Sequence, residues 1–308
     1  MNEIICDDCL LVIPEIKKDS IDAIITDIPY GIGYDEWDVL HDNTNSAYGG
    51  ASSAQIEKGA LYRRRGKPLN GWSDADKRIG KEYQEWCVSW GEKCLHVLKP
   101  GGSCLIFAGR RYAPRCVCAL EDLGFTFKDM LSWEKRKAPH RAQRLSAIYE
   151  RRGEHHMATQ WNGWRVANLR PLFEPILWFQ KPYTLGGTLA DNVLNYGVGA
   201  WNERALDTFN KTNIPERKYS NIFYTDVFND DYGLHPTQKP LHLMMLLVEL
   251  VTRAGSVVLD PFCGSGTTCL AAKKLKRNYI GIEKDANIAK IATDRLERII
   301  PTLFDISP

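Results

Sequence analysis

Short apolar runs rich in β-branched residues alternate along the chain with amphipathic stretches of helical period. The apolar runs predict strands at residues 3–6, 23–26, 103–108, 125–133, 174–179, 256–259 and 278–282. The amphipathic stretches predict helices at residues 83–98, 241–251 and 267–275, and a Pro-Gly-Gly stop signal follows the first. Strands that alternate with helices are typical of an α/β protein with a doubly wound, mostly parallel sheet.

Two long stretches lack a single clear period. Residues 34–81 are polar and rich in Gly, Ser and Asn, and a loop of that length is normally functional or mobile. Residues 135–231 mix periods and hold four Trp, although the strand at 174–179 belongs by its pattern to the core sheet. We therefore divide the chain into residues 1–134, 135–231 and 232–308.

Composition places the chain among globular proteins. Its 308 residues are 44% hydrophobic and 25% charged, enough to bury a sizeable core without disulfides. A net charge of +2 does not exclude a nucleic-acid partner, because binding depends on how charge is distributed. No apolar run reaches the length of about 18 residues that predicts a membrane helix, and the acidic N-terminal segment is unlike a signal peptide.

The cysteines indicate a reducing compartment. There are nine of them, an odd number, and they lie mostly in apolar stretches, which is typical of reduced thiols. Cys6 and Cys9 form one Cys-x-x-Cys pair without a second pair at zinc spacing, so two buried small side chains explain it better than a metal site. We therefore expect a cytoplasmic protein with no metal centre and no membrane contact.

The strongest local motif is a strand that runs into a glycine turn and a helix, Val257-Val258-Leu259-Asp260-Pro261-Phe262-Cys263-Gly264-Ser265-Gly266-Thr267-Thr268. Glycines let the backbone approach a ligand closely, and a helix N-terminus offers free N–H groups. Cys269 interrupts a dinucleotide fingerprint, and no Gly-Lys-Ser/Thr follows for a phosphate loop. The next strand ends at Glu283, where an acid favours a ribose diol over the alternative of a solvated strand end.

The second motif is Ile24-Ile25-Thr26-Asp27-Ile28-Pro29-Tyr30-Gly31, which ends an apolar strand where open α/β sheets bind their ligands. A carboxylate and a nearby backbone carbonyl can accept both N–H bonds of an exocyclic amino group on a flat base. The nitrogen lone pair then turns toward an electrophile. Pro29 fixes the backbone, and Tyr30 offers a ring for stacking. Taken alone, these residues equally fit a plain turn at a strand end.

Together the two motifs resemble the DNA methyltransferases that act on amino groups and use S-adenosylmethionine. Asp27-Ile28-Pro29-Tyr30 is similar to their catalytic Asp-Pro-Pro-Tyr, and residues 260–267 are similar to their cofactor loop. The catalytic motif comes first, as in the permuted β group. Three further parts of the chain are similar to segments of that group. They are residues 6–10 followed by 20–22, residues 98–102, and residues 235–240. The resemblance implies a seven-stranded, Rossmann-like methyltransferase sheet with a target-recognition region inserted at 135–231.

The resemblance also implies catalytic roles. Asp27 and the carbonyl of Ile28 accept hydrogen bonds from the target amino group, Pro29 shapes the turn, and Tyr30 stacks on a flipped base. Ile28 stands where the family has its first proline, and since any residue supplies a carbonyl we expect activity to survive. No Pro-Cys pair follows a strand, which argues against methylation of a cytosine carbon.

The cofactor residues implied by the resemblance come from both ends of the chain. They are Asp8, Thr237, Lys239, Asp260, Phe262, Gly264, Gly266, Thr267 and Glu283. Within this set Asp8 faces the adenine and Glu283 the ribose. Thr237 and Lys239 belong to a segment that closes over the methionine carboxylate, where a cation is electrostatically suited. For Asp8 the alternative is an ordinary acid in a loop.

Two stretches carry a surplus of positive charge. Residues 110–152 hold eleven Lys or Arg against five Asp or Glu, and residues 58–81 hold eight against two. Charge runs are usually solvated faces, but these lie beside the catalytic motif and at the start of the poorly matched middle region. We expect phosphate contacts from Arg63, Arg64, Arg65, Lys135, Arg136, Lys137, Arg141 and Arg144.

These inferences predict sequence-specific methylation of the exocyclic N6 of adenine in double-stranded DNA, with base flipping. Asp27 favours adenine, since Ser is commoner there in the family's cytosine N4 members, and cytosine N4 is the alternative. A methyltransferase of RNA or protein is a less favoured hypothesis, as is a catalytically silent DNA-binding protein, which Ile28 suggests. The resemblance implies a bacterial or phage protein of the cytoplasm. It leaves a second copy of the chain and a cognate restriction endonuclease open as partners.

Overall fold

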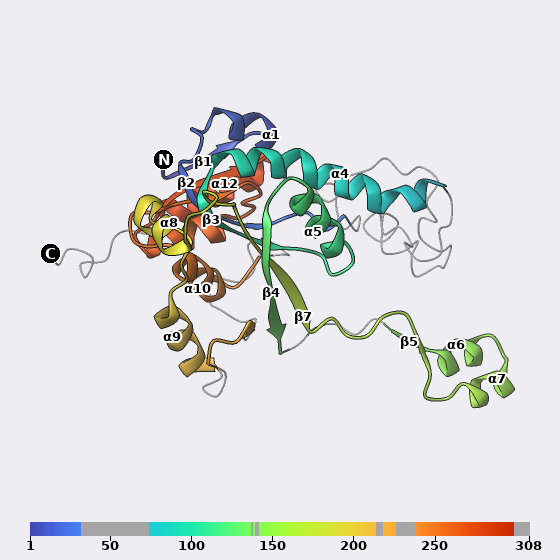
Figure 1. Cartoon of the computed structure of the whole chain (residues 1–308). Helices are drawn as coiled ribbons and strands as arrows, with labels where there is room; N and C mark the ends of the chain where they lie inside the picture. Colours follow the sequence, from blue (N-terminus) through green and yellow to red (C-terminus); the bar gives the residue numbers. More distant parts are fainter. Residues whose placement is uncertain (32–73, 137, 139–141, 214–217, 226–237, 299–308) are drawn as a thin grey trace.

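The computed structural model describes residues 1–31, 74–136, 138, 142–213, 218–225 and 238–298 (Figure 1). Its main body is built on one sheet. The strands of that sheet are β1 (Glu3–Cys6), β2 (Ile21–Asp27), β3 (Leu98–Phe107), β4 (Thr126–Lys135), β7 (Phe173–Gln180), β8 (Ile222–Thr225), β9 (Val257–Asp260) and β10 (Asn278–Glu283). Their order across the sheet is β1-β10-β9-β2-β3-β7-β4-β8.

The sheet is mostly parallel, which confirms the predicted α/β class. Only β7 among the described strands of this sheet runs against its neighbours, β3 and β4. The expected number of seven strands is wrong, because the sheet has an eighth, β8, paired in parallel with β4 at its edge. The four residues of β8 lie in the stretch of mixed period, where so short a run cannot be distinguished from a loop by its pattern.

Helices cover both faces of the sheet. On one face α1 (Cys9–Val12), α4 (Asp74–Val97) and α5 (Ala113–Asp122) share a core with Ile24, and on the other α9 (Glu203–Asn213), α10 (Leu241–Val251) and α11 (Thr267–Lys274) share a core with Ile25. Both isoleucines are fully buried, which explains why β2 reads as a continuous apolar run. The helices α8 (Leu189–Tyr196) and α12 (Ala286–Glu297) complete the main body (Figure 1).

The helix α4 starts earlier than its sequence pattern predicts. It begins at Asp74 rather than Tyr83, so the last residues of the loop expected at 34–81 are helical. Ile79 and Tyr83 are both buried, and their spacing continues the apolar stripe of the helix toward its N-terminus. The helix ends at Val97, because Leu98 opens β3. Although α4 has 24 residues, none of the described helices is long and apolar enough to cross a membrane.

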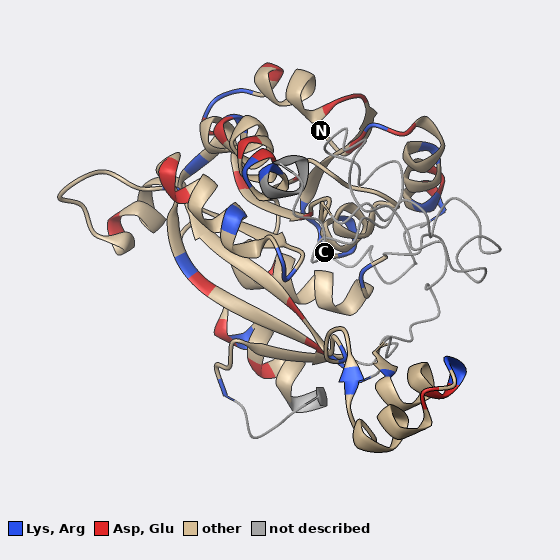
Figure 2. Ribbon diagram, turned by 90° about the vertical axis from the view of Figure 1, so that its right-hand side faces the viewer, with Lys and Arg blue, Asp and Glu red and all other residues tan. Residues whose placement is uncertain are grey.

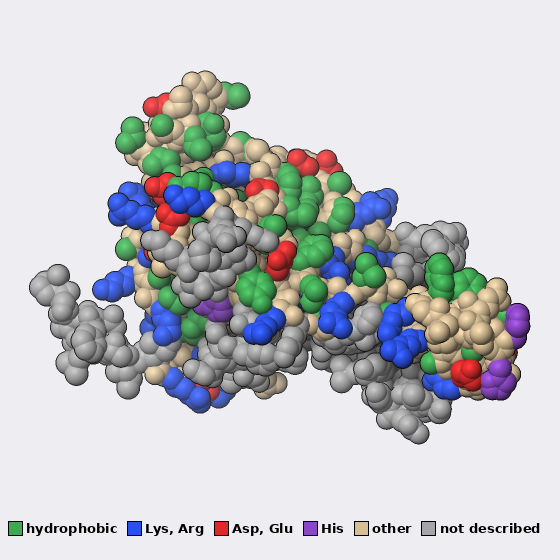
Figure 3. Space-filling model, turned by 90° about the horizontal axis from the view of Figure 1, so that it is seen from below, with side chains coloured by type: hydrophobic (Ala, Val, Ile, Leu, Met, Phe, Trp, Pro, Cys, Tyr) green, Lys and Arg blue, Asp and Glu red, His purple; other side chains and the backbone are tan. Residues whose placement is uncertain are grey.

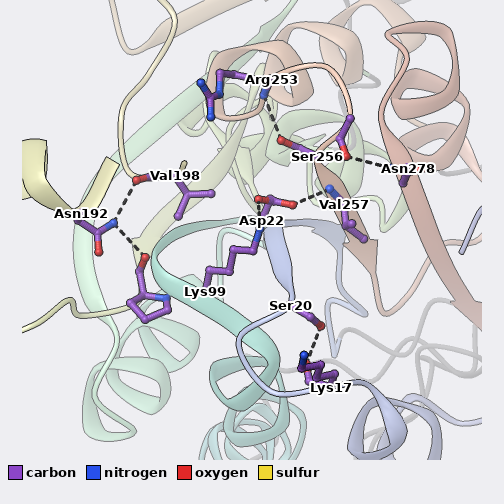
Figure 4. Close-up of polar contacts among 12 residues, drawn as sticks. Lys17, Ser20, Asp22, Lys99, Asn192, Val198, Arg253, Ser256, Val257 and Asn278 are labelled. Atoms are coloured by element: carbon purple, nitrogen blue, oxygen red, sulfur yellow. Dashed lines mark hydrogen bonds and ion pairs between the residues drawn. The ribbon is translucent and has the colours of Figure 1, made fainter. Parts of the chain in front are cut away.

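Asp22, at the start of β2, forms hydrogen bonds with the starts of the two neighbouring strands. Its carboxylate accepts hydrogen bonds from the Lys99 ammonium at 2.6 Å and from the Val257 backbone N–H at 2.7 Å (Figure 4). These bonds join β2 to the starts of β3 and β9. The segments 20–22 and 98–102, singled out in the sequence, therefore set the strand alignment and lie at the edge opposite the carboxyl ends of the strands.

A small lobe, residues 142–172, projects from the main body between β4 and β7 (Figure 1). It consists of a short ribbon, β5 (Gln143–Arg144) with β6 (Arg165–Val166), and two helices, α6 (Leu145–Arg151) and α7 (His155–Gln160). Since β4 is parallel to β2 and β3 in the sheet, its last residue, Lys135, lies at the edge where Asp27 ends β2. The lobe therefore starts from the same edge of the sheet as the motif that begins at Asp27.

Candidate functional site

The two sequence motifs meet in one cavity of about 530 Å³ at the carboxyl ends of the parallel strands. Tyr30 from the first motif and Phe262 from the second both line it. The other expected site residues that line it are Asp8, Asp27, Ile28, Pro29, Lys239, Asp260, Gly264, Thr267 and Glu283. Gly266 lies within the same turn as the N-cap of α11, and Thr237 lies outside the described residues.

Asp27 ends β2 with one carboxylate oxygen bonded and the other open. Its Oδ2 accepts a hydrogen bond from the Lys239 ammonium, which is 7% exposed and also lies 3.3 Å from the Tyr30 hydroxyl. Its Oδ1 is buried and has no hydrogen-bond partner among the described residues. Burial raises the pKa of the Asp27 carboxyl, and the charge of Lys239 opposes that shift. The site thus holds a buried acceptor oxygen, unpaired among the described residues, beside the positive charge of Lys239.

The phenol of Tyr30 is held at both of its ends. Its hydroxyl donates to Glu174 Oε2 at 3.2 Å, and burial, together with the charges of Asp27 and Glu174, raises its pKa well above the usual value, so it stays protonated. At the other end, Gly109 packs so closely that a Cβ there would lie 2.9 Å from the Cβ of Tyr30. Only glycine therefore lets the tyrosine sit in this place.

The backbone between Asp27 and Tyr30 is fixed by neighbouring elements. The Ile28 N–H donates to the Phe107 carbonyl at the end of β3, at 3.3 Å, and the Ile28 side chain is buried in the core. The Pro29 carbonyl accepts a hydrogen bond from the Tyr83 hydroxyl of α4 at 2.9 Å. Position 28 therefore contributes an apolar anchor and a backbone donor, and a proline there could fill only the first of these roles because it has no N–H.

The glycine turn opens toward the cavity. Gly264 and Gly266 have φ angles of +51° and +79°, in the region that favours glycine. A Cβ on Gly264 would meet nothing within 4 Å, so the backbone there borders open space. The Gly264 N–H donates to Glu283 Oε2 at 3.0 Å, and burial raises the pKa of Glu283. The acid at the end of β10 therefore sits directly against the turn.

An aromatic cluster joins the two motifs from the side of α4. The ring of Phe262 lies 5.6 Å from that of Trp86 and 5.7 Å from that of Trp90. Trp86 also lines the cavity. Neither tryptophan belongs to a motif of the sequence, although their spacing of four residues in a predicted helix places them on one face.

Two further acids border the cavity. Asp260 is 3% exposed, and burial raises its pKa to about 6. Asp8 caps α1 by accepting from the Leu10 N–H at 2.9 Å, and it pairs with the Lys284 ammonium at 2.9 Å. Although burial acts in the opposite direction, these contacts with Lys284 and Leu10 lower the pKa of Asp8. Asp8 is therefore a structural cap as well as a cavity residue.

The structure adds Arg295 of α12 to the site. It is 7% exposed and donates to the Ser265 carbonyl at 3.0 Å and to Thr267 Oγ1 at 2.9 Å, so it braces the glycine turn from behind. Nothing in the sequence distinguishes it from the other charged residues of an amphipathic helix.

The expected DNA contacts are dispersed. Lys135 is largely buried, because its ammonium contacts Glu174 and only 18% of its side chain is exposed. Arg136 is exposed just beyond β4, and Arg144 is exposed in the lobe. The remaining ones, Arg63, Arg64, Arg65, Lys137 and Arg141, lie outside the described residues.

Sequence comparison identifies the kind of protein that shares this arrangement. Residues 21–294 match the DNA methylase family N6_N4_Mtase. The Type II methyltransferase M.HindIII of Haemophilus influenzae is 58% identical over 289 residues, which cover 94% of this chain and 93% of that protein.

Solved structures share the fold. A modification methylase of Thermus thermophilus complexed with S-adenosyl-L-methionine, described as putative, has a TM-score of 0.59 and 17% identity over 98% of this chain and 96% of its own. The PvuII DNA methyltransferase, described as cytosine-N4-specific, has a TM-score of 0.61 and 14% identity over 97% of this chain and 87% of its own.

Proposed function

Since the chain belongs to the N6_N4 family of DNA methylases, we propose that it transfers a methyl group from S-adenosylmethionine to the exocyclic N6 of adenine in duplex DNA. The observation that carries this proposal is the shared cavity lined by Tyr30 and Phe262. Residues from both motifs line the same cavity, so a methyl donor and a flat acceptor base can meet in it.

S-adenosylmethionine is the cofactor of this family, and the cavity fits it. The open backbone at Gly264 leaves room for a ligand against the turn, and Glu283 offers carboxylate oxygens to a ribose diol. Asp260 and Phe262 line the space between that end and Asp27. When bound, the cofactor supplies a methyl group on a sulfonium centre, an electrophile that needs no further activation.

The chain's own residues then orient the acceptor. Asp27 Oδ1 accepts one N–H of the target amino group and is placed to take the proton that the nitrogen loses. The second acceptor is the Ile28 carbonyl, because the Pro29 carbonyl is occupied by the Tyr83 hydroxyl. Tyr30 presents its ring to the base. Positioning and exclusion of water supply most of the reduction in the barrier.

The preference for adenine over cytosine rests on Asp27. A carboxylate at the opening position of the catalytic motif favours adenine, where the cytosine N4 members of the family more often have Ser. The PvuII enzyme, described as cytosine-N4-specific, is only 14% identical to this chain. Its similarity concerns the fold and does not indicate which base this chain methylates.

Basic residues of the lobe support a contact with duplex DNA. Arg144, Arg165 and Arg170 are exposed in or beside the ribbon of the lobe. Figure 2 shows Lys and Arg at the base and tip of the lobe, and Figure 3 shows them on the side of the lobe that faces the main body. The lobe starts beside the catalytic edge, so a duplex lying between lobe and body can present a flipped base to Tyr30.

Two partners remain predictions. A cognate restriction endonuclease would cut the sequence that this chain protects, and a second copy of the chain would form a dimer. Challenge of methylated DNA with restriction enzymes tests the first, and light scattering of the purified protein tests the second.

Label transfer tests the proposed reaction. Wild-type protein is incubated with duplex DNA and cofactor labelled on its methyl group, and the DNA is digested to nucleosides. Label in N6-methyldeoxyadenosine is expected; label in N4-methyldeoxycytidine would reassign the base, and DNA binding without label would contradict the proposal. The control Asp27→Ala should abolish transfer while its cofactor affinity stays within about threefold, because the Gly264 turn is separate.

A further inference from the structure

Glu174 lies at the start of β7, where no role is assigned to it by the motifs. It faces Trp133 across the antiparallel β4–β7 pair. Because β7 runs against the other strands, its first residues lie at the edge where β2 and β3 end. Its side chain is 19% exposed and does not line the cofactor cavity.

Both oxygens of Glu174 are used. Oε2 accepts the Tyr30 hydroxyl at 3.2 Å and lies 3.7 Å from the Lys239 ammonium. Oε1 accepts a hydrogen bond from the Lys135 ammonium. One carboxylate thus connects β4 and the segment before α10 with the catalytic tyrosine.

The charges of this network balance. Two carboxylates, Asp27 and Glu174, alternate with two ammonium groups, Lys239 and Lys135. Although burial acts in the opposite direction, the two lysines lower the pKa of Glu174, and the two carboxylates raise the pKa of Lys239. Removing one member of such a set leaves a buried charge without compensation, which is costly.

Lys239 and the incoming amino group use different oxygens of Asp27. The ammonium bonds Oδ2, and the amino group is expected at Oδ1, which has no hydrogen-bond partner among the described residues. The Glu174 carboxylate lies 3.7 Å from the same ammonium and is its second counter-ion.

We propose that Glu174 is a positioning residue for methyl transfer. It holds Tyr30 as a stacking face for the target base and shares with Asp27 the charge of Lys239, which leaves Asp27 Oδ1 for the amino group. The inference rests on the proposed function, whose catalytic residues it positions.

The conservative variant Glu174→Gln tests this role. Its amide can still accept from the Tyr30 hydroxyl but cannot balance Lys239. We expect kcat for methyl transfer to fall about tenfold to hundredfold, while KM for S-adenosylmethionine stays within about twofold because Glu174 does not line that cavity. Restoring the charge with Glu174→Asp should recover part of kcat.

Tyr30→Phe provides a second, independent test, because it removes only the hydroxyl that Glu174 holds. Its effect on kcat should be non-additive with that of Glu174→Gln, since both act on one network. The control is Asp19→Asn, which removes a lysine-paired carboxylate (Lys181, 2.7 Å) at the opposite edge of the sheet and should leave kcat unchanged.

The outcomes separate the two proposals. A wild-type protein that transfers no methyl group contradicts the proposed function. An active wild type, with Glu174→Gln and Tyr30→Phe both folded and equal to it in kcat, overturns the role of Glu174. If Glu174→Gln does not fold, an unchanged kcat in Tyr30→Phe overturns the positioning of the tyrosine, and a reduced kcat with unchanged KM supports it.

Discussion

The ammonium of Lys239 contacts the carboxylate of Asp27 across a separation of 212 residues in the chain. The family resemblance implies a place for Lys239 at the methionine carboxylate of the cofactor, and the structure puts its ammonium against Asp27 as well as in the wall of the cavity. The lysine therefore affects the charge of the residue that we propose as the acceptor of the amino group.

Replacing this lysine should change the pH dependence of the reaction. Burial raises the pKa of Asp27, and Lys239 holds it down. In Lys239→Met the pKa rises further, so a smaller fraction of Asp27 is ionised at neutral pH. We expect slower single-turnover methylation and an acidic limb of the pH–rate profile displaced to higher pH. Lys290→Met, which removes an exposed ion pair on α12, is the matched control and should leave the acidic limb in place. A displaced acidic limb in Lys290→Met, or an unchanged acidic limb in Lys239→Met, would contradict the effect of Lys239 on the pKa of Asp27.

Cofactor affinity should depend on the ionisation of Asp260. Its pKa is raised by burial to about 6. Above that pH the carboxylate is charged and attracts a sulfonium, and as pH falls through 6 it becomes neutral and the attraction is lost. Titration calorimetry should show affinity for S-adenosylmethionine falling about tenfold or less between pH 7 and pH 5, where tenfold equals about 1.4 kcal/mol. The change should be smaller in Asp260→Asn, and an identical pH profile in that variant would exclude Asp260 as its cause.

Loss of the Arg295 brace should loosen the glycine turn. Arg295→Met removes hydrogen bonds to Ser265 and Thr267, and we expect the free energy of unfolding to fall by about 2 kcal/mol in chemical denaturation. Cofactor affinity should fall several-fold as well. Lys273→Met is the control, since it removes a different bond between α11 and α12, to the Leu296 carbonyl. Equal losses of affinity in the two variants would refute a specific action on the turn.

Exposed arginines of the lobe should contribute to DNA affinity through counterion release. Arg144→Gln with Arg170→Gln should weaken duplex binding and reduce the slope of log affinity against log salt by about one per lost phosphate contact. Arg253→Gln, exposed beside the start of β9 at the opposite edge, should leave the slope unchanged (Figure 4). A lobe variant with the wild-type slope would remove the lobe from the DNA interface. The same measurement applies to Arg63, Arg64 and Arg65.

The parts of the fold that are marked by a continuous apolar run were predictable. The strand β1 and the helix α10 have the bounds that their apolar patterns indicate, and β2 extends the predicted run by only a few residues. In such elements the apolar run itself marks the ends. The short strand β8 and the N-terminal turns of α4 were missed, because there a few apolar positions stand among polar ones.

In the site, too, some residues could be predicted from the sequence and others could not. Asp27 ends β2 and Gly264 lies in the turn that follows β9, so the alignment of parallel strands brings them together and the sequence alone suggests it. Glu174 and Lys135 come together because β4 pairs with β7, two strands that the whole lobe separates in the sequence. Arg295 contacts the glycine turn from α12, which lies later in the chain. Such contacts depend on tertiary packing, which no local period records.

The pairing of β1 with β10 has a consequence for synthesis of the chain. The ribosome makes Asp27 early, but the cleft is closed only after β10 has left the exit tunnel and docked between β1 and β9. A truncated product that ends before β10 therefore carries Asp27 and Tyr30 but lacks Glu283 and the strand that lies between β1 and β9. We expect such a product to have no complete cavity for a methyl donor, so that modification begins only with a nearly complete polypeptide.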